Sequence, residues 1–350
     1  MADKIRVGVV GAGAIGTVHV NSWKQVPGAE VVALSEINEE RAAARAKALG
    51  VPSWFGDYRE MVRRAEIDAV DVCTPNYLHC PVAVAALSAG KHVICEKPMA
   101  MNKAEGLKMV AAAKKAKRTL MMAFCMRYRG DSQAAKKLVD AGELGNIYHI
   151  RVITMRRRGI PGLGGWFTRI EQGGGGPLLD IGVHLLDLSL WLAGFPQPKS
   201  ACASKYTEFG DRKDYTYLGM WGTPEPGGPF TVEDLVSGFV RFKNGMSLTL
   251  EAAWAANVAG ESFIDLMGDK GGIRLALGET LALYAQRNGQ LVDVKPLFKN
   301  PDAYVEEVKH FAECIRTGKT PMSPGEDGVK VQAVIDGLYR SAEAGKEVNI

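Results

Sequence analysis

The stretch IRVGVVGAGAIG, residues 5–16, decides the fold. Its first half predicts a buried strand, and GAGAIG then follows the G-x-G-x-x-G pattern at the point where a helix begins. In this context the glycines permit a tight turn, a close approach of the backbone to a pyrophosphate, and close packing of helix on strand. The helix N-terminus favours an anion there. The sequence therefore predicts a dinucleotide-binding turn made of Gly11, Gly13, Ala14, Ile15 and Gly16.

An acidic residue ends the next predicted strand, EVVALSE. This residue, Glu36, stands 20 positions after Gly16, where a carboxylate accepts hydrogen bonds from the ribose hydroxyls of NAD. The same carboxylate would repel the 2′-phosphate of NADP. The sequence therefore favours NAD over NADP as the cofactor.

The first third of the chain continues as alternating helices and strands. The helix EERAAARAKAL is followed by Gly50, a residue favoured just past a helix C-terminus. DAVDVCTP and KHVICEKP predict later strands, and near-continuous apolar strands between helices are typical of a parallel sheet covered on both faces. We therefore expect an α/β protein whose N-terminal part, residues 1–123, is a doubly wound Rossmann domain.

Residues 124–350 follow a different pattern. RFKNGMSLTL, LMGDKGGIRLAL and LYAQRNGQLVDV each predict a hairpin, and Asn-Gly is the strongest of these signals because both turn residues take positive φ. Helices are expected near 301–317 and 325–344, and the Gly- and Pro-rich segment 207–231 predicts an irregular excursion. The second domain is therefore expected to be an α+β unit with an open, largely antiparallel sheet.

Composition limits the classes of function. Hydrophobic residues make up 47% of the chain and charged residues 23%, which is typical of a soluble globular protein. The net charge of +4, with both signs interspersed, lacks the clustered basic residues of a nucleic-acid-binding protein. No signal-peptide pattern and no membrane-spanning apolar run is present. The six cysteines show no metal-ligand spacing, so we expect a reduced, cytoplasmic protein without a metal site or a membrane partner.

Polar residues follow two of the predicted parallel strands, at the edge where such sheets bind ligands. After the first strand, Thr74, Pro75 and Asn76 can line the cofactor, although Pro and Asn serve equally well in a turn before a helix. His79 either neighbours the cofactor or simply occupies the first turn of that helix.

The second strand ends in Glu96 and Lys97, followed by Pro98, which restricts the backbone beyond them. Lys97 is either a surface charge at a strand end or a functional amine near the nicotinamide.

GGGGPLLDIGVHLLDLSLW, residues 173–191, carries charges within an apolar helix. Pro177 suits the first helical position, which places Asp180 and His184 at i and i+4 on one face. A histidine paired with a carboxylate in this way is a candidate acid or base, because its pKa lies near neutrality. The alternative is an ordinary buried helix with a satisfied histidine. Asp187 is interpreted as support, and the glycines as room for a ligand.

The motifs GAGAIG, TPNYLH, GKHVICEKPMA, GELGNIY and GGGGPLLDIGVHLLDLSLWLAG together resemble those of the Gfo/Idh/MocA family of NAD(P)-dependent sugar and polyol oxidoreductases, which includes inositol dehydrogenases. The likeness extends from the first strand to the closing SAEAGKEV, and RRGIPG and WFT resemble a sugar-dehydrogenase branch. The resemblance implies a Rossmann domain joined to an open-sheet domain that binds substrate and forms a homodimer or homotetramer.

The resemblance also assigns site residues. The family's catalytic lysine, aspartate and histidine fall on Lys97, Asp180 and His184, and an arginine that contacts cofactor or substrate falls on Arg127. One position departs from the pattern, because Cys125 stands where the family often has asparagine. Our hypothesis is that His184 takes the hydroxyl proton, Lys97 hydrogen-bonds the same oxygen, and Asp180 orients the substrate hydroxyls and tunes the other two groups.

Two further groups are candidates for substrate binding. Trp166, with Phe167 and Arg169 beside it, can stack on a sugar ring or simply pack at a domain interface. Arg156, in the run Arg156–Arg158, can hold an acidic group of the substrate, whereas a solvated strand end is the alternative.

Three functions remain open at this stage. The first is an NAD-dependent dehydrogenase acting on a secondary hydroxyl of a sugar or polyol. The second is a glycosidase or lyase that oxidises a sugar hydroxyl transiently with NAD. The third, a non-catalytic dinucleotide sensor, is disfavoured because a sensor needs only the Rossmann half.

Overall fold

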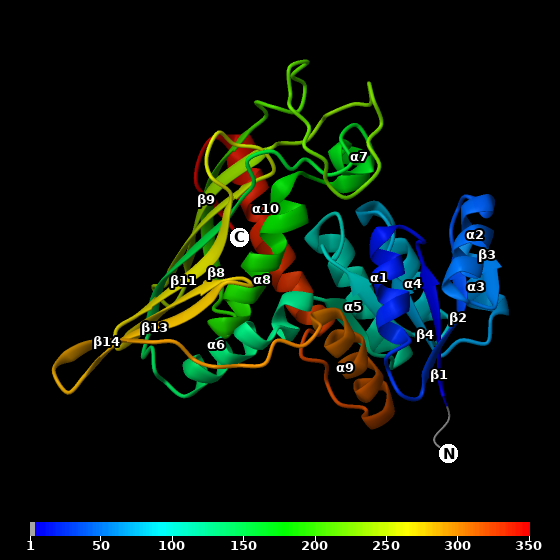
Figure 1. Ribbon diagram of the computed structural model, residues 1–350, viewed down its shortest axis with the longest axis horizontal. Helices are drawn as coiled ribbons and strands as arrows, with labels where there is room; N and C mark the ends of the chain where they lie inside the picture. The colour runs from blue at the N-terminus through cyan, green and yellow to red at the C-terminus, as the bar shows by residue number, and fades with distance from the viewer. Residues whose placement is uncertain (1–3) are drawn as a thin grey trace. The chain divides into compact units, whose positions relative to one another are not determined.

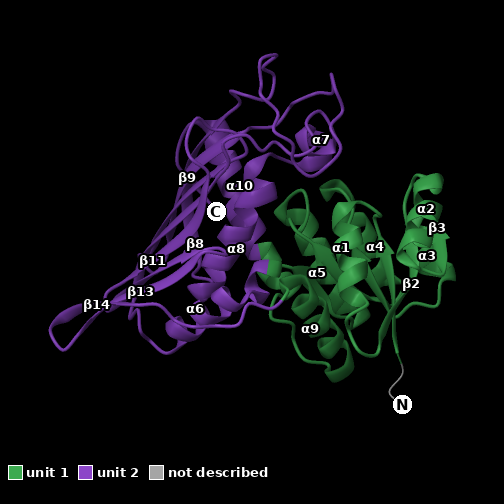
Figure 2. Cartoon of the chain, in the orientation of Figure 1, with its two compact units in different colours: residues 1–125, 302–329 green, residues 126–301, 330–350 purple. Residues whose placement is uncertain are grey.

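The computed structural model describes residues 4–350, which form two compact units (Figure 2). Unit 1 contains the residues up to Cys125 together with Asp302–Val329, and unit 2 contains Met126–Pro301 and Lys330–Ile350. The sequence-based division placed all residues from 124 onward in the second domain. In the structure, residues 302–329 instead group with the N-terminal unit.

Unit 1 is built on a six-stranded parallel sheet with the order β3-β2-β1-β4-β5-β6 (Figure 1). The strand order reverses between β1 and β4, which is where doubly wound sheets bind their ligands. The predicted Rossmann domain is confirmed. Its strands are β1 (Ile5–Val10), β2 (Ala29–Ser35), β3 (Ser53–Phe55), β4 (Ala69–Val72), β5 (His92–Glu96) and β6 (Leu120–Ala123).

Helices cover this sheet, with α1 packed against α9 and α4 packed against α5. Local signals fix their ends: Asn38 caps the start of α2 by accepting a hydrogen bond from the Arg41 N–H, and Gly50 ends α2 with a φ of 63°. The helices of unit 1 are α1 (Ala14–Trp23), α2 (Glu39–Leu49), α3 (Tyr58–Arg64), α4 (His79–Ser88), α5 (Lys103–Ala116) and α9 (Ala303–Thr317).

Unit 2 contains a nine-stranded sheet with the order β14-β13-β12-β11-β7-β10-β9-β8-β15. Its pairs are antiparallel except β7–β10, so the predicted, largely antiparallel sheet is confirmed. The strands are β7 (Ile147–Met155), β8 (Pro198–Tyr206), β9 (Leu235–Phe242), β10 (Ser247–Ala253), β11 (Glu261–Gly268), β12 (Gly271–Ala276), β13 (Thr280–Arg287), β14 (Gln290–Val294) and β15 (Val348–Asn349).

All three predicted hairpins are present, but their turns differ. Asn288 and Gly289 between β13 and β14 both have positive φ, at 52° and 78°, as a two-residue Asn-Gly turn requires. Between β9 and β10 only Gly245 does, at 89°. The segment between β8 and β9 contains no strand or helix, as the sequence predicts for most of it.

The helices of unit 2 are α6 (Gly130–Asp140), α7 (Ile170–Gly173) and α8 (Val183–Leu192), and α10 (Gly325–Ala344) begins in unit 1 and continues into unit 2. Helix α8 packs against β7 and β11. The helix expected from Pro177 onward is not uniformly α-helical, because Leu178–Gly182 form a π-helical turn that packs on β10. Such turns often occur at functional sites.

Among residues 4–350, no helix has the length and apolar character needed to cross a membrane.

Candidate functional site

The glycine turn between β1 and α1 is shaped by contacts of the chain with itself. A Cβ on Gly11, whose φ is 103°, would lie 2.3 Å from the Cys73 carbonyl oxygen, and one on Gly16 would lie 2.0 Å from that of Gly11. A Cβ on Gly13 would meet no atom within 4 Å, so the middle glycine borders open space. Ala14 and Ile15 begin α1 immediately after it. This arrangement fits a pyrophosphate approaching the backbone at Gly13.

Glu36 is buried directly after β2 and is joined to the glycine turn. Its Oε2 accepts a 3.2 Å hydrogen bond from the backbone N–H of Ala12, and its Oε1 pairs with the guanidinium of Arg41. The carboxylate is therefore held at a fixed place beside the turn. The position suits a ribose diol, as the sequence predicts.

The loop after β4 supplies a buried hydroxyl that points to a ligand site. Thr74 Oγ1 is buried and has no hydrogen-bond partner within the described part of the chain, and Asn76 is buried in the short 3₁₀ turn that Pro75 introduces. A buried hydroxyl without a partner is unfavourable unless a bound group or water satisfies it. Thr74 therefore fits the cofactor-lining role that the sequence assigned to this loop.

His79 is buried in the first turn of α4 and joins two loops. Its Nδ1 lies 2.7 Å from the carbonyl oxygen of Pro98, and its Nε2 lies 2.9 Å from that of Thr74. Of the two alternatives left open for this residue, the structural one accounts for both ring nitrogens. Burial lowers the pKa of His79, although its two carbonyl partners oppose this.

The carboxyl end of β5 places Glu96 inside unit 1 and Lys97 at its half-buried edge. Glu96 Oε2 accepts a 3.0 Å hydrogen bond from the backbone N–H of Lys97. Cys125, at the position where asparagine was expected, is buried, and burial raises the pKa of its thiol far above the usual value. A neutral thiol there is a poor substitute for an amide that donates and accepts hydrogen bonds.

In unit 2, the π-helical turn presents Asp180 just before His184. Asp180 is buried, and its Oδ2 accepts a 2.8 Å hydrogen bond from the indole N–H of Trp254. The guanidinium of Arg156 lies 4.0 Å from the same oxygen. His184 is half-buried in the first turn of α8.

Arg156 is thus not a solvated strand end. Its side chain is only 29% exposed, and Nη1 also donates to the Gly159 carbonyl oxygen at 3.2 Å. Burial lowers the pKa of Arg156, while the charge of Asp180 opposes this. Its neighbour Arg158 stacks instead over the rings of Phe209 and Tyr215.

Arg127 and Asp187 form a buried ion pair within unit 2. The Nε and Nη2 atoms of Arg127 donate to the two carboxylate oxygens of Asp187 at 3.0 and 2.6 Å. A two-point pair of this kind fixes the planes of both groups. The supporting role expected for Asp187 therefore has a specific partner that the sequence did not identify.

The aromatic pair before the glycine run packs within the protein. Trp166 stacks on Phe167 with ring centroids 3.6 Å apart, and Trp221 meets the Phe167 ring edge-on at 4.6 Å. Phe167 is buried in a core that includes Ile181 and Trp254. Packing in this core explains the position of Phe167. Trp166 keeps part of its side chain exposed, and Arg169 forms an ion pair with Glu225 on the irregular excursion.

The buried carboxyl group of Glu233 accepts a hydrogen bond from the backbone of the glycine run. Gly176 N–H donates to Glu233 Oε1 at 2.9 Å, and the Tyr339 hydroxyl donates to the same atom at 2.7 Å. A Cβ on Gly176 would lie 2.0 Å from the Glu233 carbonyl oxygen, so this glycine makes room for the chain itself rather than for a ligand. Burial raises the pKa of Glu233 to about 7 against the opposing hydrogen bonds.

Sequence reasoning missed Trp254, Glu233 and Tyr339 as parts of this site. They are far from the motifs along the chain and follow no recognisable spacing, so only the tertiary fold brings them to Asp180 and the glycine run.

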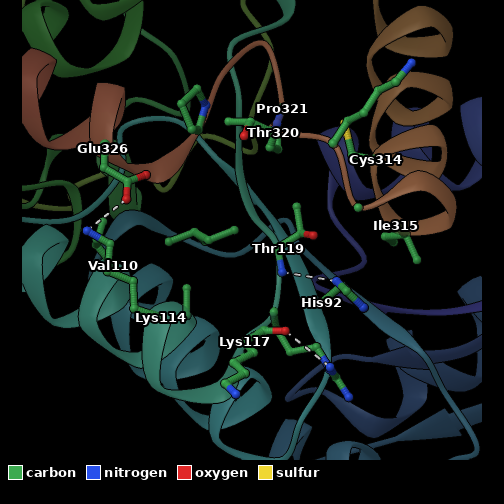
Figure 3. Close-up of a pocket in the computed structure, with 16 residues that line it drawn as sticks. His92, Val110, Lys114, Lys117, Thr119, Cys314, Ile315, Thr320, Pro321 and Glu326 are labelled. Carbon is green, nitrogen blue, oxygen red and sulfur yellow. Dashed lines mark hydrogen bonds and ion pairs between the residues drawn. The ribbon is translucent and has the colours of Figure 1, made fainter.

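A cavity of about 320 Å³ in unit 1 is lined by none of the residues assigned to the site (Figure 3). It is lined by the start of β6 and by the C-terminal ends of α5 and α9, at the sheet edge opposite the glycine turn. Two of its three lysines have acidic partners: Lys114 pairs with Glu326 and Lys319 with Glu313. Helix C-termini and paired cations do not favour an anionic ligand.

Comparison with known proteins covers both units. Residues 5–124 match the oxidoreductase family with an NAD-binding Rossmann fold, and residues 132–274 match the GFO/IDH/MocA C-terminal domain. The chain is 33% identical to D-glucoside 3-dehydrogenase of Escherichia coli K12, an alignment that covers 100% of this chain and 98% of that protein.

Solved structures show the same similarity. Aldose-aldose oxidoreductase from Caulobacter crescentus, complexed with glycerol, superimposes with a TM-score of 0.83 and 28% identity, over 99% of this chain and 100% of that protein. Levoglucosan dehydrogenase in complex with NADH and levoglucosan gives a TM-score of 0.86 and 25% identity over the same shares.

Proposed function

Because the chain belongs to the Gfo/Idh/MocA family of NAD-binding oxidoreductases, we propose that it transfers a hydride between NAD and a secondary hydroxyl of a sugar, polyol or sugar derivative. The family establishes the coarser statement, that the protein is an NAD-dependent dehydrogenase acting on CH–OH groups. The class of hydroxyl compound and the role of each residue are our proposals.

The groups of unit 1 would hold the cofactor. The glycine turn would receive the pyrophosphate, Glu36 the ribose hydroxyls, and Thr74 and Asn76 would border the nucleotide from the next loop. NAD, when bound, supplies the hydride acceptor. The remaining chemistry is to orient one hydroxyl and to remove its proton.

Three side chains would do this work. His184 would take the hydroxyl proton, Lys97 would hydrogen-bond the same oxygen as negative charge develops on it, and Asp180 would orient the neighbouring hydroxyls. The observation that carries the proposal is the anchoring of Asp180 by Trp254 beside Arg156, just before the half-buried His184. A carboxylate fixed in this way can orient a polyhydroxylated substrate, and Arg156 can donate to one of its hydroxyl or acidic groups.

The relatives favour a cyclic carbohydrate as the substrate. The E. coli relative is a D-glucoside 3-dehydrogenase, and a structural relative binds levoglucosan. Because these proteins are named as dehydrogenases, the glycosidase or lyase alternative is not favoured. We also propose a homodimer or homotetramer, which light scattering of the purified protein will test.

A panel of glycosides, aldoses and polyols incubated with NAD tests the function, with NADH absorbance as the readout. Net NADH formation from a cyclic sugar or polyol is the expected result. Release of an aglycone from a chromogenic glycoside, without net NADH, would instead support the cleavage mechanism and overturn the proposal.

A further inference from the structure

A buried histidine in α1, outside the assigned site, joins two carboxylates. His19 Nδ1 lies 2.9 Å from Asp71 Oδ2 in β4, and His19 Nε2 lies 3.1 Å from Glu96 Oε1 at the end of β5. All three side chains are buried. The histidine therefore links the first helix to two strand ends of the parallel sheet.

The contacts of His19 bear on whether its ring is protonated. A neutral imidazole has one N–H, so it cannot donate to carboxylates on both sides. Asp71 is also an acceptor for the Trp23 indole N–H at 2.7 Å and faces the Cys73 thiol at 3.4 Å. Burial by itself lowers the pKa of His19, but the charge and hydrogen bond of Asp71, with a further contribution from Cys73, raise it well above its usual range. Carboxylates on both sides of the ring therefore favour the protonated form of His19.

The cluster continues to Lys97 through the backbone. One oxygen of Glu96 faces His19, and the other accepts the Lys97 N–H at 3.0 Å. On the far side of Lys97, His79 Nδ1 meets the carbonyl oxygen of Pro98. The segment from Glu96 to Pro98 is therefore held at both ends by buried histidines.

We propose that His19 is a positioning residue for Lys97, acting by fixing the carboxylate of Glu96, which in turn fixes the backbone from which the Lys97 amine extends. This inference rests on the proposed role of Lys97 in the reaction. Movement of a reacting group by about 1 Å can lower a rate about 100-fold, so a support of this kind can control turnover without touching the substrate.

A metal site and a purely structural cluster are the alternatives to a positioning role. His19, Asp71 and Cys73 offer the atom types of a metal site, but His19 and Asp71 meet at a hydrogen-bond distance and Asp71 already accepts from Trp23. A purely structural cluster would stabilise the fold without affecting Lys97. Metal content and the reactivity of Lys97 therefore distinguish the three roles.

The test compares His19→Gln with Trp23→Phe, which also removes a donor to Asp71 but keeps the histidine between the two carboxylates. We expect His19→Gln to lower kcat about tenfold or more, with the Kd of NAD changed by less than about threefold. Trp23→Phe should lower the unfolding temperature by about as much as His19→Gln does. Its kcat should stay within about threefold of the wild-type value. The loss of kcat in the double variant His19→Gln/Glu96→Gln should be no larger than that in the worse single variant. Both changes break the same contact, between His19 and Glu96, so their effects should not add.

A second readout needs no substrate. The rate of Lys97 acetylation by acetic anhydride, followed against pH by mass spectrometry, should change in His19→Gln and stay unchanged in Trp23→Phe. If the wild type oxidises no compound of the panel but this labelling changes, the proposed function fails and the positioning role stands. Equal labelling curves in the two variants, or one equivalent of tightly bound metal in the wild type, would overturn the positioning role.

Discussion

The indole N–H of Trp254 donates a 2.8 Å hydrogen bond to Oδ2 of Asp180, which ties the residue after β10 to the π-helical turn before α8. Both side chains are buried, so the bond fixes the carboxylate in one orientation. The position of the other carboxylate oxygen, Oδ1, is therefore set by contacts with the buried core and not by a loop. The same core supports the turn that leads to His184.

Trp254→Phe should release this carboxylate while keeping most of the packing. We expect kcat/KM for the sugar or polyol to fall about 10- to 150-fold, because a hydrogen bond to a charged group contributes about 1.5–3 kcal/mol. The Kd of NAD should not change. Trp221→Phe, which changes an indole on the irregular excursion, is the matched control, and an equal loss in both variants would exclude a specific role for the bond.

His184→Ala should lower kcat by about 10²–10⁴-fold if His184 removes the hydroxyl proton. Steady-state kinetics at saturating NAD and substrate will measure this. His149→Asn changes a histidine on β7 that contacts Ser247, and it should leave kcat unaltered. A loss below about tenfold would remove His184 from the role of general base.

Glu36→Ala should change the choice of cofactor. The variant loses the acceptor for the Ala12 N–H and frees Arg41 to meet a 2′-phosphate. The ratio of kcat/KM for NAD to that for NADP should fall at least about tenfold. Glu39→Ala, in the first turn of α2, serves as the control, and an unchanged ratio in Glu36→Ala would contradict the assignment of Glu36 to the ribose.

Asp187→Ala should destabilise unit 2, because it leaves the buried guanidinium of Arg127 without its carboxylate. Removing one partner of a buried pair costs about 3–5 kcal/mol. Urea unfolding will measure this, and Asp214→Ala, which breaks an exposed pair with Arg212, should not shift the midpoint. An unfolding midpoint that Asp187→Ala leaves unchanged would contradict the stabilising role of this buried pair.

Glu233→Gln tests the buried acid beneath the glycine run. Burial raises the pKa of Glu233 from 4.5 to about 7, so the protonated acid favours the folded state. That contribution is complete below pH 4.5 and is lost as the pH rises to about 7. Glutamine mimics the protonated acid, so the variant should gain about 3 kcal/mol relative to the wild type between about pH 4.5 and about pH 8.

The control for this measurement is Glu343→Gln, an exposed position on α10 that pairs with Lys205. Its difference from the wild type should stay constant with pH. A constant difference for Glu233→Gln as well would show that folding does not raise the pKa of Glu233.

Local sequence signals predicted both sheets but not the grouping of residues 302–329 with the first unit. The glycine motif, Gly50 and the Asn-Gly turn at residues 288–289 each act over a few residues, and each has the conformation its chemistry requires. The π-helical turn at Asp180 was not foreseen, because Leu178–Gly182 are compatible with an ordinary helix and the widened turn forms where Gly182 packs tightly on Ala252 of β10.

The candidate site was only partly predictable, because several of its contacts join residues that are far apart in the sequence. Glu36, Lys97 and His184 stand in motifs. The supporting contacts His19–Asp71, Trp254–Asp180 and Glu233–Gly176 instead join residues 52 or more positions apart. No short-range spacing marks such residues. Arg156 illustrates the limit, since a basic run is usually solvated and only the fold brings it to Asp180.

The return of α9 to unit 1 has a consequence for synthesis of the chain. Phe311 of α9 meets the ring of Trp23 edge-on at 6.2 Å, and both residues are fully buried. When the first 125 residues leave the ribosome, nearly 180 further residues must be synthesised before α9 can pack on the outer face of α1. We therefore expect the nascent Rossmann half to expose an apolar surface to chaperones throughout elongation, and a gene fragment ending near residue 125 to aggregate.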